Sequence, residues 1–478
     1  MFKMSNHPNF RAIHHQTLAE IPICLGEFSM GIAFGWLAPM IRDILDDPKS
    51  EISANEDQCS WLASLLEFGR AFSPLLTLLL LDILGRKIML QISSTIFFAI
   101  WLIITFTRSI VTLCVTFFFF GLGIGIFNAA SAVYIGENSS PNLRGIFCSA
   151  CTTAFYISAL IQYIISGYLP YRVLAITNLI MALVCLTSTL LYVESAQFLI
   201  LRGRFEKAEK NMMWLKGTVD KEDIATEFEA IKANIESEKE KKTSYKELLK
   251  APANYKSLLI VLILNMAHAS TGNAALFTYI SIIFPPNKFF TWYQVTVYFG
   301  ISQMTFSLLA SVVIEKYNRR TLTLFSFTMF LLCHSTAAYF FYDADHNSSP
   351  IRFGVWVIFG SVCTFSGCSA VLDSVMHMLR GELFPQSIKP IGTGLTVVAR
   401  SLMEFVTIKI FLMIRSQYGT YANFIAYAAI SLISVLFCYF VLPETRGKTL
   451  IEIQNSLERQ TPNTSSQNED EEQLFDEQ

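Results

Sequence analysis

The chain of 478 residues is 53% hydrophobic and only 15% charged, and its net charge is −2. Soluble globular proteins carry about 25% charged residues, so most of this chain is too apolar to form both a core and a water-soluble surface. The near-zero net charge also gives no electrostatic basis for binding nucleic acid, which we therefore exclude as a partner.

The charged residues gather in two segments. Residues 194–255 hold 12 basic and 12 acidic residues, and residues 443–478 hold 3 and 9. Elsewhere the sequence forms long apolar runs, and about 20 apolar residues suffice for a helix that crosses a bilayer. We find twelve such runs, at 16–41, 60–82, 88–107, 109–135, 146–168, 171–193, 256–284, 291–315, 321–342, 352–381, 388–416 and 420–442.

These runs predict an all-α integral membrane protein with twelve transmembrane helices in two pseudo-symmetric six-helix bundles, because backbone groups in lipid must be satisfied within their own segment. The bundles would cover residues 16–193 and 256–442. Residues 194–255 would form a helical linker on the membrane surface. The N-terminal segment 1–15 and the tail 443–478 complete the chain, and the tail is expected to be disordered after about residue 458.

The distribution of lysine and arginine predicts the orientation. The segments on the side of the N-terminus, including the linker and the tail, hold 26 of these residues, and the opposite loops hold 7. Basic residues concentrate on the cytoplasmic side of membrane proteins. We therefore expect a multi-pass protein of the cell membrane with both termini in the cytoplasm.

The two blocks repeat a pattern of charges. An acid with a base four residues later follows the second run and recurs 233 residues on, after the eighth. An acid with a base seven residues later follows the fourth run and recurs 245 residues on, after the tenth. The pairs are Asp82 with Arg86, Glu315 with Arg319, Glu137 with Arg144, and Glu382 with Lys389.

This repeat indicates a duplicated architecture, and it predicts a cytoplasmic gate. Acids and bases from the two halves could pair there, and ion pairs at a partly wet surface contribute roughly 0–1 kcal/mol, weak enough to break in a cycle. The alternative is that the bases only set the topology. That alternative leaves the acids at fixed offsets unexplained.

Several motifs resemble the sugar porter family of the major facilitator superfamily. The most specific is the sequence 443–450, PETRGKTL, directly after the twelfth run. Others are the loop 82–87, the glycine run 121–125, the segment 194–199 and the sequence 381–385. The resemblance implies transport by alternating access, and it adds Glu444 of the first motif to the predicted gate.

The resemblance also implies a central pocket, near residues 162 and 268, that binds a sugar such as trehalose or a hexose. Gln162 falls where the family has a sugar-binding glutamine. Its amide can donate and accept, which suits a polyol. His268 and His377 stand where the family has other contact residues, and Asn273 adjoins such a position, so these three are the further candidates. No cofactor, no metal, no enzymatic activity and no partner other than the sugar and the bilayer are expected, and the protein should be monomeric.

Two alternatives stay open. Proton-coupled relatives have a carboxylate in the first helix close to where this chain has Ala33, so a uniporter is favoured over a symporter. The loss of several family contact residues also permits a nutrient sensor that does not transport. Charged residues within the runs, such as Glu67 with Arg70 and Arg400 with Glu404, are spaced to pair locally on one helix face.

Overall fold

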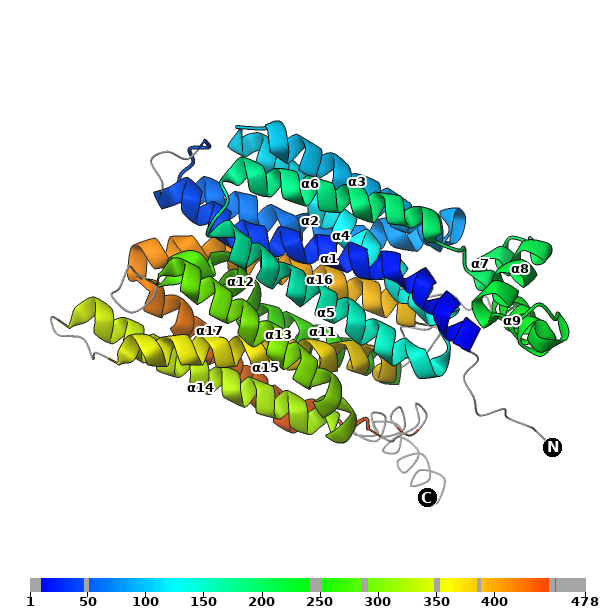
Figure 1. Cartoon of the computed structure of the whole chain (residues 1–478). Coiled ribbons are helices and arrows are strands. Elements are labelled where there is room, and N and C mark those ends of the chain that lie inside the picture. The colour runs from blue at the N-terminus through cyan, green and yellow to red at the C-terminus, as the bar shows by residue number, and fades with distance from the viewer. Residues whose placement is uncertain are drawn as a thin grey trace, which may run out of the picture.

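The structure is a computed structural model that describes residues 10–46, 51–240, 252–284, 291–347, 353–384, 388–446 and 452. Long helices make up two bundles that lie side by side (Figure 1). The helices of the first bundle are α1 (Phe10–Asp46), α2 (Glu56–Leu84), α3 (Arg86–Phe106), α4 (Ile110–Asn138), α5 (Pro141–Ser166) and α6 (Tyr171–Ser188), the last extended by the short helix η1 (Thr189–Leu191). The second bundle contains α11 (Pro252–Ser270), α12 (Asn273–Ile283), α13 (Trp292–Lys316), α14 (Arg319–His346), α15 (Gly354–Leu383), α16 (Lys389–Tyr418) and α17 (Thr420–Val441).

The expected single helix over 256–284 is wrong in one respect, because it is broken between α11 and α12. Gly272 at the break has φ +87°, and a Cβ there would lie 2.3 Å from the ring of Tyr427. Only glycine adopts this backbone conformation at low cost and leaves room for the ring. Broken helices in membranes are tolerated where the freed backbone groups are enclosed by protein.

Eleven helical stretches of the described residues are long and apolar enough to cross a membrane. The twelfth run corresponds to α16, which has 30 residues but is interrupted by charged residues. Arg400, Glu404 and Lys409 all lie in its middle. With α11 and α12 counted as one span, the twelve expected crossings are present, six in each bundle.

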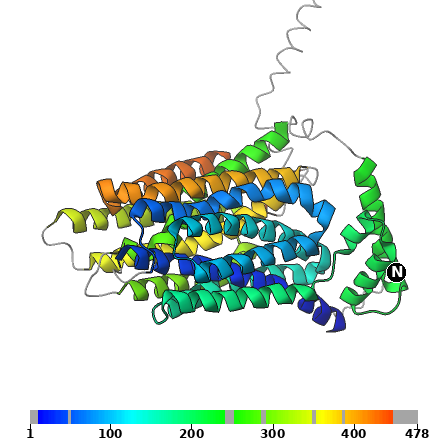
Figure 2. The same ribbon diagram turned by 90° about the horizontal axis from the view of Figure 1, so that it is seen from above.

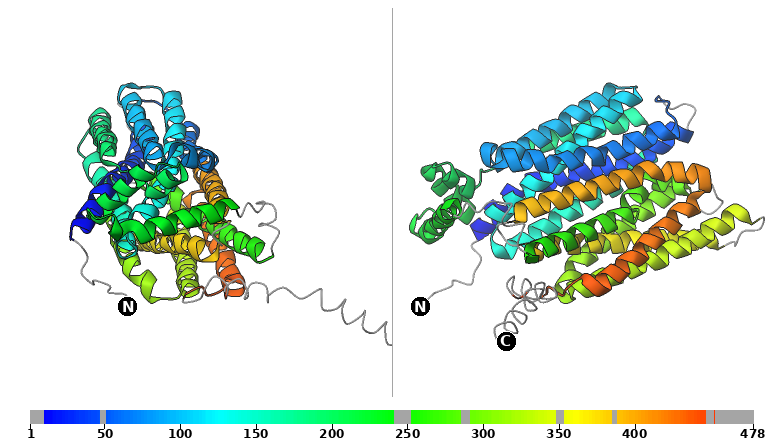
Figure 3. Two further views of the ribbon diagram at one scale, coloured as in Figure 1. Left: turned by 90° about the vertical axis from the view of Figure 1, so that its right-hand side faces the viewer. Right: turned by 180° about the vertical axis from the view of Figure 1, so that it is seen from behind.

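Three shorter helices, α7 (Ala196–Leu201), α8 (Phe205–Lys216) and α9 (Glu222–Glu240), lie across one end of the first bundle (Figure 2). They share a small hydrophobic core of their own. Helix α8 docks on the start of α1, where the rings of His15 and Trp214 stack 4.8 Å apart. We call this end of the molecule the linker end and the opposite one the far end. Helix α1 begins and α17 ends at the linker end (Figure 3).

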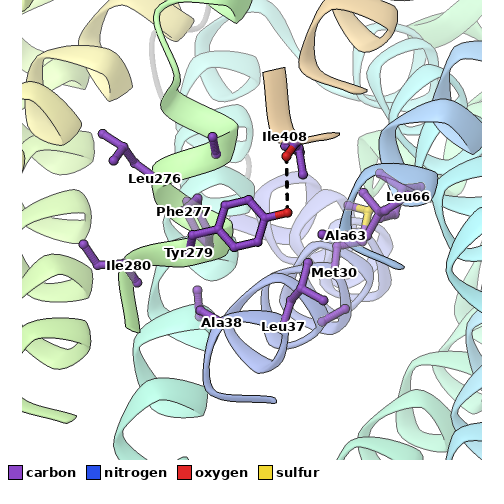
Figure 4. Packing of buried hydrophobic residues seen from close by; sticks show 14 of the residues in the cluster. Met30, Leu37, Ala38, Ala63, Leu66, Leu276, Phe277, Tyr279, Ile280 and Ile408 are labelled. Atoms are coloured by element: carbon purple, nitrogen blue, oxygen red, sulfur yellow. Dashed lines mark hydrogen bonds between the residues drawn. The ribbon is translucent and has the colours of Figure 1, made fainter. Parts of the chain in front are cut away.

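The two bundles contact each other along three helix pairs, α2 with α16, α5 with α13, and α1 with α12. Near the far end, Arg42 lies over the ring of Trp292 and Lys409 binds Asp57 at 2.6 Å. At mid-depth, apolar side chains of α1, α2, α12 and α16 interlock. There Tyr279 donates a hydrogen bond to the carbonyl oxygen of Ile408 (Figure 4).

Candidate functional site

A charged network joins α2, α3 and α4 at the linker end of the first bundle. Arg86 donates from Nη2 to Glu137 Oε1 at 2.8 Å and from Nε to Oε2 at 3.0 Å, and its Nη1 lies 3.0 Å from Asp82 Oδ1. The side chains of Arg86 and Glu137 are each 10% exposed, whereas that of Asp82 is 69% exposed. The Arg86–Glu137 pair is the stronger of the two ion pairs, because it is formed through two nitrogens and is largely shielded from water.

The second bundle repeats this network. Arg319 donates from Nε and Nη2 to Glu382 Oε1 at 3.3 and 3.2 Å, and Thr445 donates to the other carboxylate oxygen at 2.6 Å. The two arginines each begin a helix, α3 or α14, and reach a glutamate near the end of the following helix, α4 or α15. The structure therefore brings Arg86 together with Glu137 and Arg319 together with Glu382.

Each network is completed by a glutamate that follows the last helix of its bundle. Glu194 Oε1 accepts from the first two backbone N–H groups of α3, at 3.1 and 3.2 Å. Glu444 accepts from the first two N–H groups of α14, at the same two distances. Carboxylates at helix N-termini satisfy otherwise unpaired donors and interact favourably with the helix dipole. Burial raises the pKa of Glu194, and its backbone N–H donors oppose that shift.

The sequence predicted a role for Glu444 and missed Glu194. The signal was present, because Glu194-Ser195 after the sixth run matches Glu444-Thr445 after the twelfth. Glu194 follows the sixth run, outside the loops after the second, fourth, eighth and tenth runs that carry the repeated charges. These two glutamates hold helix N-termini, so they tie the ends of each bundle together.

The remaining predicted gate residues do not join these pairs. Arg144 is exposed and donates to the carbonyl oxygen of Gly136 at 2.6 Å. Lys389 begins α16, and no ion pair of its side chain is found among the described residues. Glu315 lies in α13, and its side chain is outside the described part. Within that part, every ion pair of the two linker-end networks forms inside one bundle.

At mid-depth, Gln162 of α5 is fully buried. No described donor or acceptor pairs with its amide nitrogen or oxygen, and Asn273 Oδ1 at the start of α12 is likewise buried and unpaired. Tyr163, the next residue after Gln162, belongs to an aromatic cluster, in which the ring of Phe277 is 6.2 Å from Tyr163 and 5.8 Å from Phe34. Buried amides without partners are costly, so these groups favour a ligand or a water molecule.

The two histidines differ in environment. His268 of α11 is fully buried; its Nε2 lies 2.9 Å from Ser369 Oγ and its Nδ1 lies 3.5 Å from Asp373 Oδ1. His377, one turn after Asp373 on α15, is exposed. Both ring nitrogens of His268 thus face neighbours from its own bundle, which leaves His377 as the more accessible of the two for a substrate.

A chain of charged side chains crosses between the bundles near Asp373. Arg400 of α16 donates to Asp373 at 2.6 Å and to Glu404 at 2.8 Å. The other oxygen of Glu404 lies 3.6 Å from Nη1 of Arg70, a residue of α2, and that same nitrogen donates to Glu67 at 3.3 Å. We call these five residues the interbundle chain. The sequence predicted its two local pairs but not the contact that joins them.

Two hollows stand out on the surface of the described part, and neither lies between the bundles. One of about 360 Å³ lies between α14 and α17, lined by residues such as Tyr339 and Ile425, and one of about 130 Å³ lies between α8 and α9. The pocket expected near residues 162 and 268 is therefore not one of them. Gln162 is enclosed in this conformation, and the ring of Phe277 packs beside its neighbour Tyr163.

Two six-helix bundles that carry the same charged network define a duplicated membrane transporter. The family model described as "Sugar (and other) transporter" matches residues 21–457. The chain belongs to this family, whose members move solutes across membranes and are not enzymes.

Two curated relatives match over nearly their whole lengths. The facilitated trehalose transporter Tret1 of Polypedilum vanderplanki is 26% identical over 447 residues, covering 93% of this chain and 88% of the relative. The mouse facilitated glucose transporter member 8 of solute carrier family 2 is 25% identical, covering 91% and 93%. Among solved structures, an inward open conformation of the xylose transporter XylE from E. coli has a TM-score of 0.73 at 18% identity, covering 93% of this chain and 99% of that one.

Proposed function

We propose that the protein moves a sugar, of the trehalose or hexose type, down its concentration gradient by alternating access. The observation that carries this proposal is the pair of matching linker-end networks, which makes each bundle a rigid unit closed on itself. Two such units joined at the far end and at mid-depth can rock against each other about the contacts between them. The facilitated transport printed in the names of the curated relatives supports the same function.

The proposed orientation puts the linker end in the cytoplasm and the protein in the cell membrane as a monomer. In this conformation the far end is joined by the Lys409–Asp57 and Arg42–Trp292 contacts, while each ion pair of the linker-end networks stays inside one bundle in the described part of the chain. These contacts support an inward-facing state for this conformation. When the protein turns outward, Arg144 and Lys389 are the bases left to meet acids of the opposite bundle.

For the substrate site we propose Gln162, Asn273 and His377 as direct contacts, with His268 beside them. Gln162 and Asn273 carry buried polar atoms without a partner among the described residues, and the hydroxyl groups of a sugar can satisfy them. Phe277 and Tyr163 provide ring faces on the same level. The substrate would reach these groups once the aromatic cluster moves.

The direct experiment is uptake of radiolabelled trehalose, glucose, fructose and polyols by reconstituted protein. We expect saturable uptake of at least one of them that stops at equal concentrations inside and outside. A sugar that binds and is not carried across would favour a sensor on the same scaffold instead.

A second candidate is a transporter that couples the sugar to protons. It is favoured by Asp373, a carboxylate within a membrane-spanning helix whose side chain is 22% exposed. Uptake that a protonophore abolishes, and that exceeds the equilibrium level when the outside is made acidic, would select this candidate over the first.

A further inference from the structure

The interbundle chain contains more acids than bases. Its carboxyl groups belong to Glu67, Asp373 and Glu404, and its guanidinium groups belong to Arg70 and Arg400. A buried array with an unbalanced charge is disfavoured in a medium of low dielectric constant, and one further positive charge would balance these five residues. A proton is the smallest group that supplies it.

The geometry indicates where that proton lies. Glu404 is bound by Arg400 through Oε1, whereas its Oε2 is buried and accepts no hydrogen bond from any described residue. Arg70 Nη1 lies 3.6 Å from this oxygen, which is too long for a hydrogen bond. An unsatisfied carboxylate oxygen at this depth costs several kcal/mol unless a donor reaches it.

The missing donor is the carboxyl group of Glu67. It is 2% exposed, and its Oε2 lies 3.3 Å from the same nitrogen of Arg70 that Glu404 approaches from the other bundle. Two buried carboxylate oxygens, Glu67 Oε2 and Glu404 Oε2, thus converge on one nitrogen of Arg70, at 3.3 and 3.6 Å. Ionised carboxylates only accept hydrogen bonds and repel each other, so a proton on one of them removes the repulsion and supplies the donor that the other lacks.

We propose that Glu67 and Glu404 hold one proton between them at neutral pH, and that this shared proton joins α2 of the first bundle to α16 of the second. Glu67 is the donor, since Glu404 accepts a hydrogen bond of 2.8 Å from Arg400, whereas Glu67 has only the longer contact of 3.3 Å with Arg70. This proton-binding site lies at the contact between the bundles, and it is separate from the proposed sugar contacts. The proposal holds whether or not protons cross the membrane with the substrate.

Other charged and titratable groups near the chain are Glu27 of α1, which interacts electrostatically with Arg70, and His377 and Arg380 of α15. Arg380 is a further buried cation, but its Nε donates to the carbonyl oxygen of Met376, and no ion pair of it with a carboxyl group is found among the described residues. Asp373 is paired with Arg400 at 2.6 Å. The competing site for the extra proton is His268, whose Nδ1 lies 3.5 Å from Asp373.

Infrared spectroscopy of the purified protein tests the proposal without any transport assay. A protonated carboxyl group has a C=O stretching band that a carboxylate lacks. We expect Glu67→Gln to remove about one such group at pH 7. Glu404→Gln should also remove it, because Glu67 would then ionise beside Arg70. Asp57→Asn, in the pair with Lys409 at the far end, should leave the band unchanged.

The proposal is overturned if Glu67→Gln leaves the band intact, or if Glu404→Gln leaves it while Glu67→Gln removes it. A band unchanged in both variants, with a histidine signal lost in His268→Gln, would place the proton on His268 and also overturn it. If Glu67→Gln does not fold, Glu404→Gln gives the same test of the pair.

Thermal unfolding gives a second readout. The folded protein would hold a proton that the unfolded chain releases at neutral pH, so its melting temperature should fall as the pH rises from 6 to 9. In Glu67→Gln this part of the fall is absent, and the profile is flatter than in the wild type or in Asp57→Asn. Parallel profiles in all three proteins would contradict the shared proton.

Discussion

The linker end and the middle of the molecule use charged residues in opposite ways. At the linker end the same network occurs twice, once in each bundle, and each copy closes on itself, Arg86 with Glu137 and Arg319 with Glu382. In the middle a single chain runs from one bundle to the other, through Arg70 and Glu404. The linker-end networks stiffen each bundle, and the interbundle chain holds the two bundles together. Duplication accounts for the two linker-end networks, whereas the interbundle chain occurs once in the described part of the molecule.

The largest effect should follow from breaking the interbundle chain. Arg400→Leu leaves the carboxylates of Asp373 and Glu404 without their main partner, and removing one member of a buried ion pair costs about 3–5 kcal/mol. We expect a large fall in the melting temperature of the detergent-solubilised protein. Arg400→Lys keeps the charge but cannot span both carboxylates, so it should be intermediate. Unchanged melting of Arg400→Leu would show that the chain is not holding the bundles.

The linker-end networks should matter more for movement than for stability. Glu382→Gln weakens the contact to Arg319 and leaves a neutral group of the same size, so we expect a drop in sugar exchange of about tenfold, roughly 1.4 kcal/mol, at normal surface expression. Arg144→Gln should reduce exchange in the same way, through a contact made in the other conformation. Asp82→Asn, at a side chain of the same kind of network that is 69% exposed, should have a smaller effect than Glu382→Gln. Wild-type exchange in both variants would remove the proposed gate.

A smaller effect is expected at the buried amide of Gln162. Gln162→Leu replaces an amide that has no partner in the described part of the chain by an apolar group of similar size, so the melting temperature should stay the same or rise. If the amide serves the substrate, the KM for sugar should rise about five- to tenfold, as for the loss of about one hydrogen bond. A fall in stability with an unchanged KM would mean that Gln162 only packs helices.

The smallest effect belongs to the far end. The Lys409–Asp57 pair is partly exposed, and such pairs contribute about 0–1 kcal/mol. Lys409→Gln should change the exchange rate less than twofold and leave the melting temperature within a few degrees. A tenfold effect would mean that the far end, rather than the linker end, carries the gate.

Much of the fold followed from the sequence, because a bilayer leaves few choices. Runs of about 20 apolar residues predicted twelve crossings, and the structure has them at nearly the expected bounds. The helix break at Gly272 was missed, since an apolar run shows no interruption where one glycine is forced into a left-handed conformation by a neighbouring ring. The sequence Ser270-Thr271-Gly272-Asn273 was the available signal.

The site was harder to predict. Repeats in the sequence revealed the acids and bases of the linker end, but not which would pair, because that depends on the conformation of the two bundles. The local spacing of Glu67 with Arg70 and of Arg400 with Glu404 was visible, yet the contact between these pairs joins residues more than 300 positions apart. No spacing rule reaches that far. The packing of Phe277 against Tyr163, the neighbour of Gln162, likewise depends on the tertiary structure.

The account depends most directly on two bundles that expose one sugar site to each side in turn. Reconstituted protein, loaded with unlabelled sugar and placed in labelled sugar at equal concentration, should exchange the two in a saturable way. Exchange should be faster than net uptake when the return of the empty protein is slow. Exchange no faster than that of protein-free liposomes, for trehalose and every hexose tested, would contradict transport by this chain.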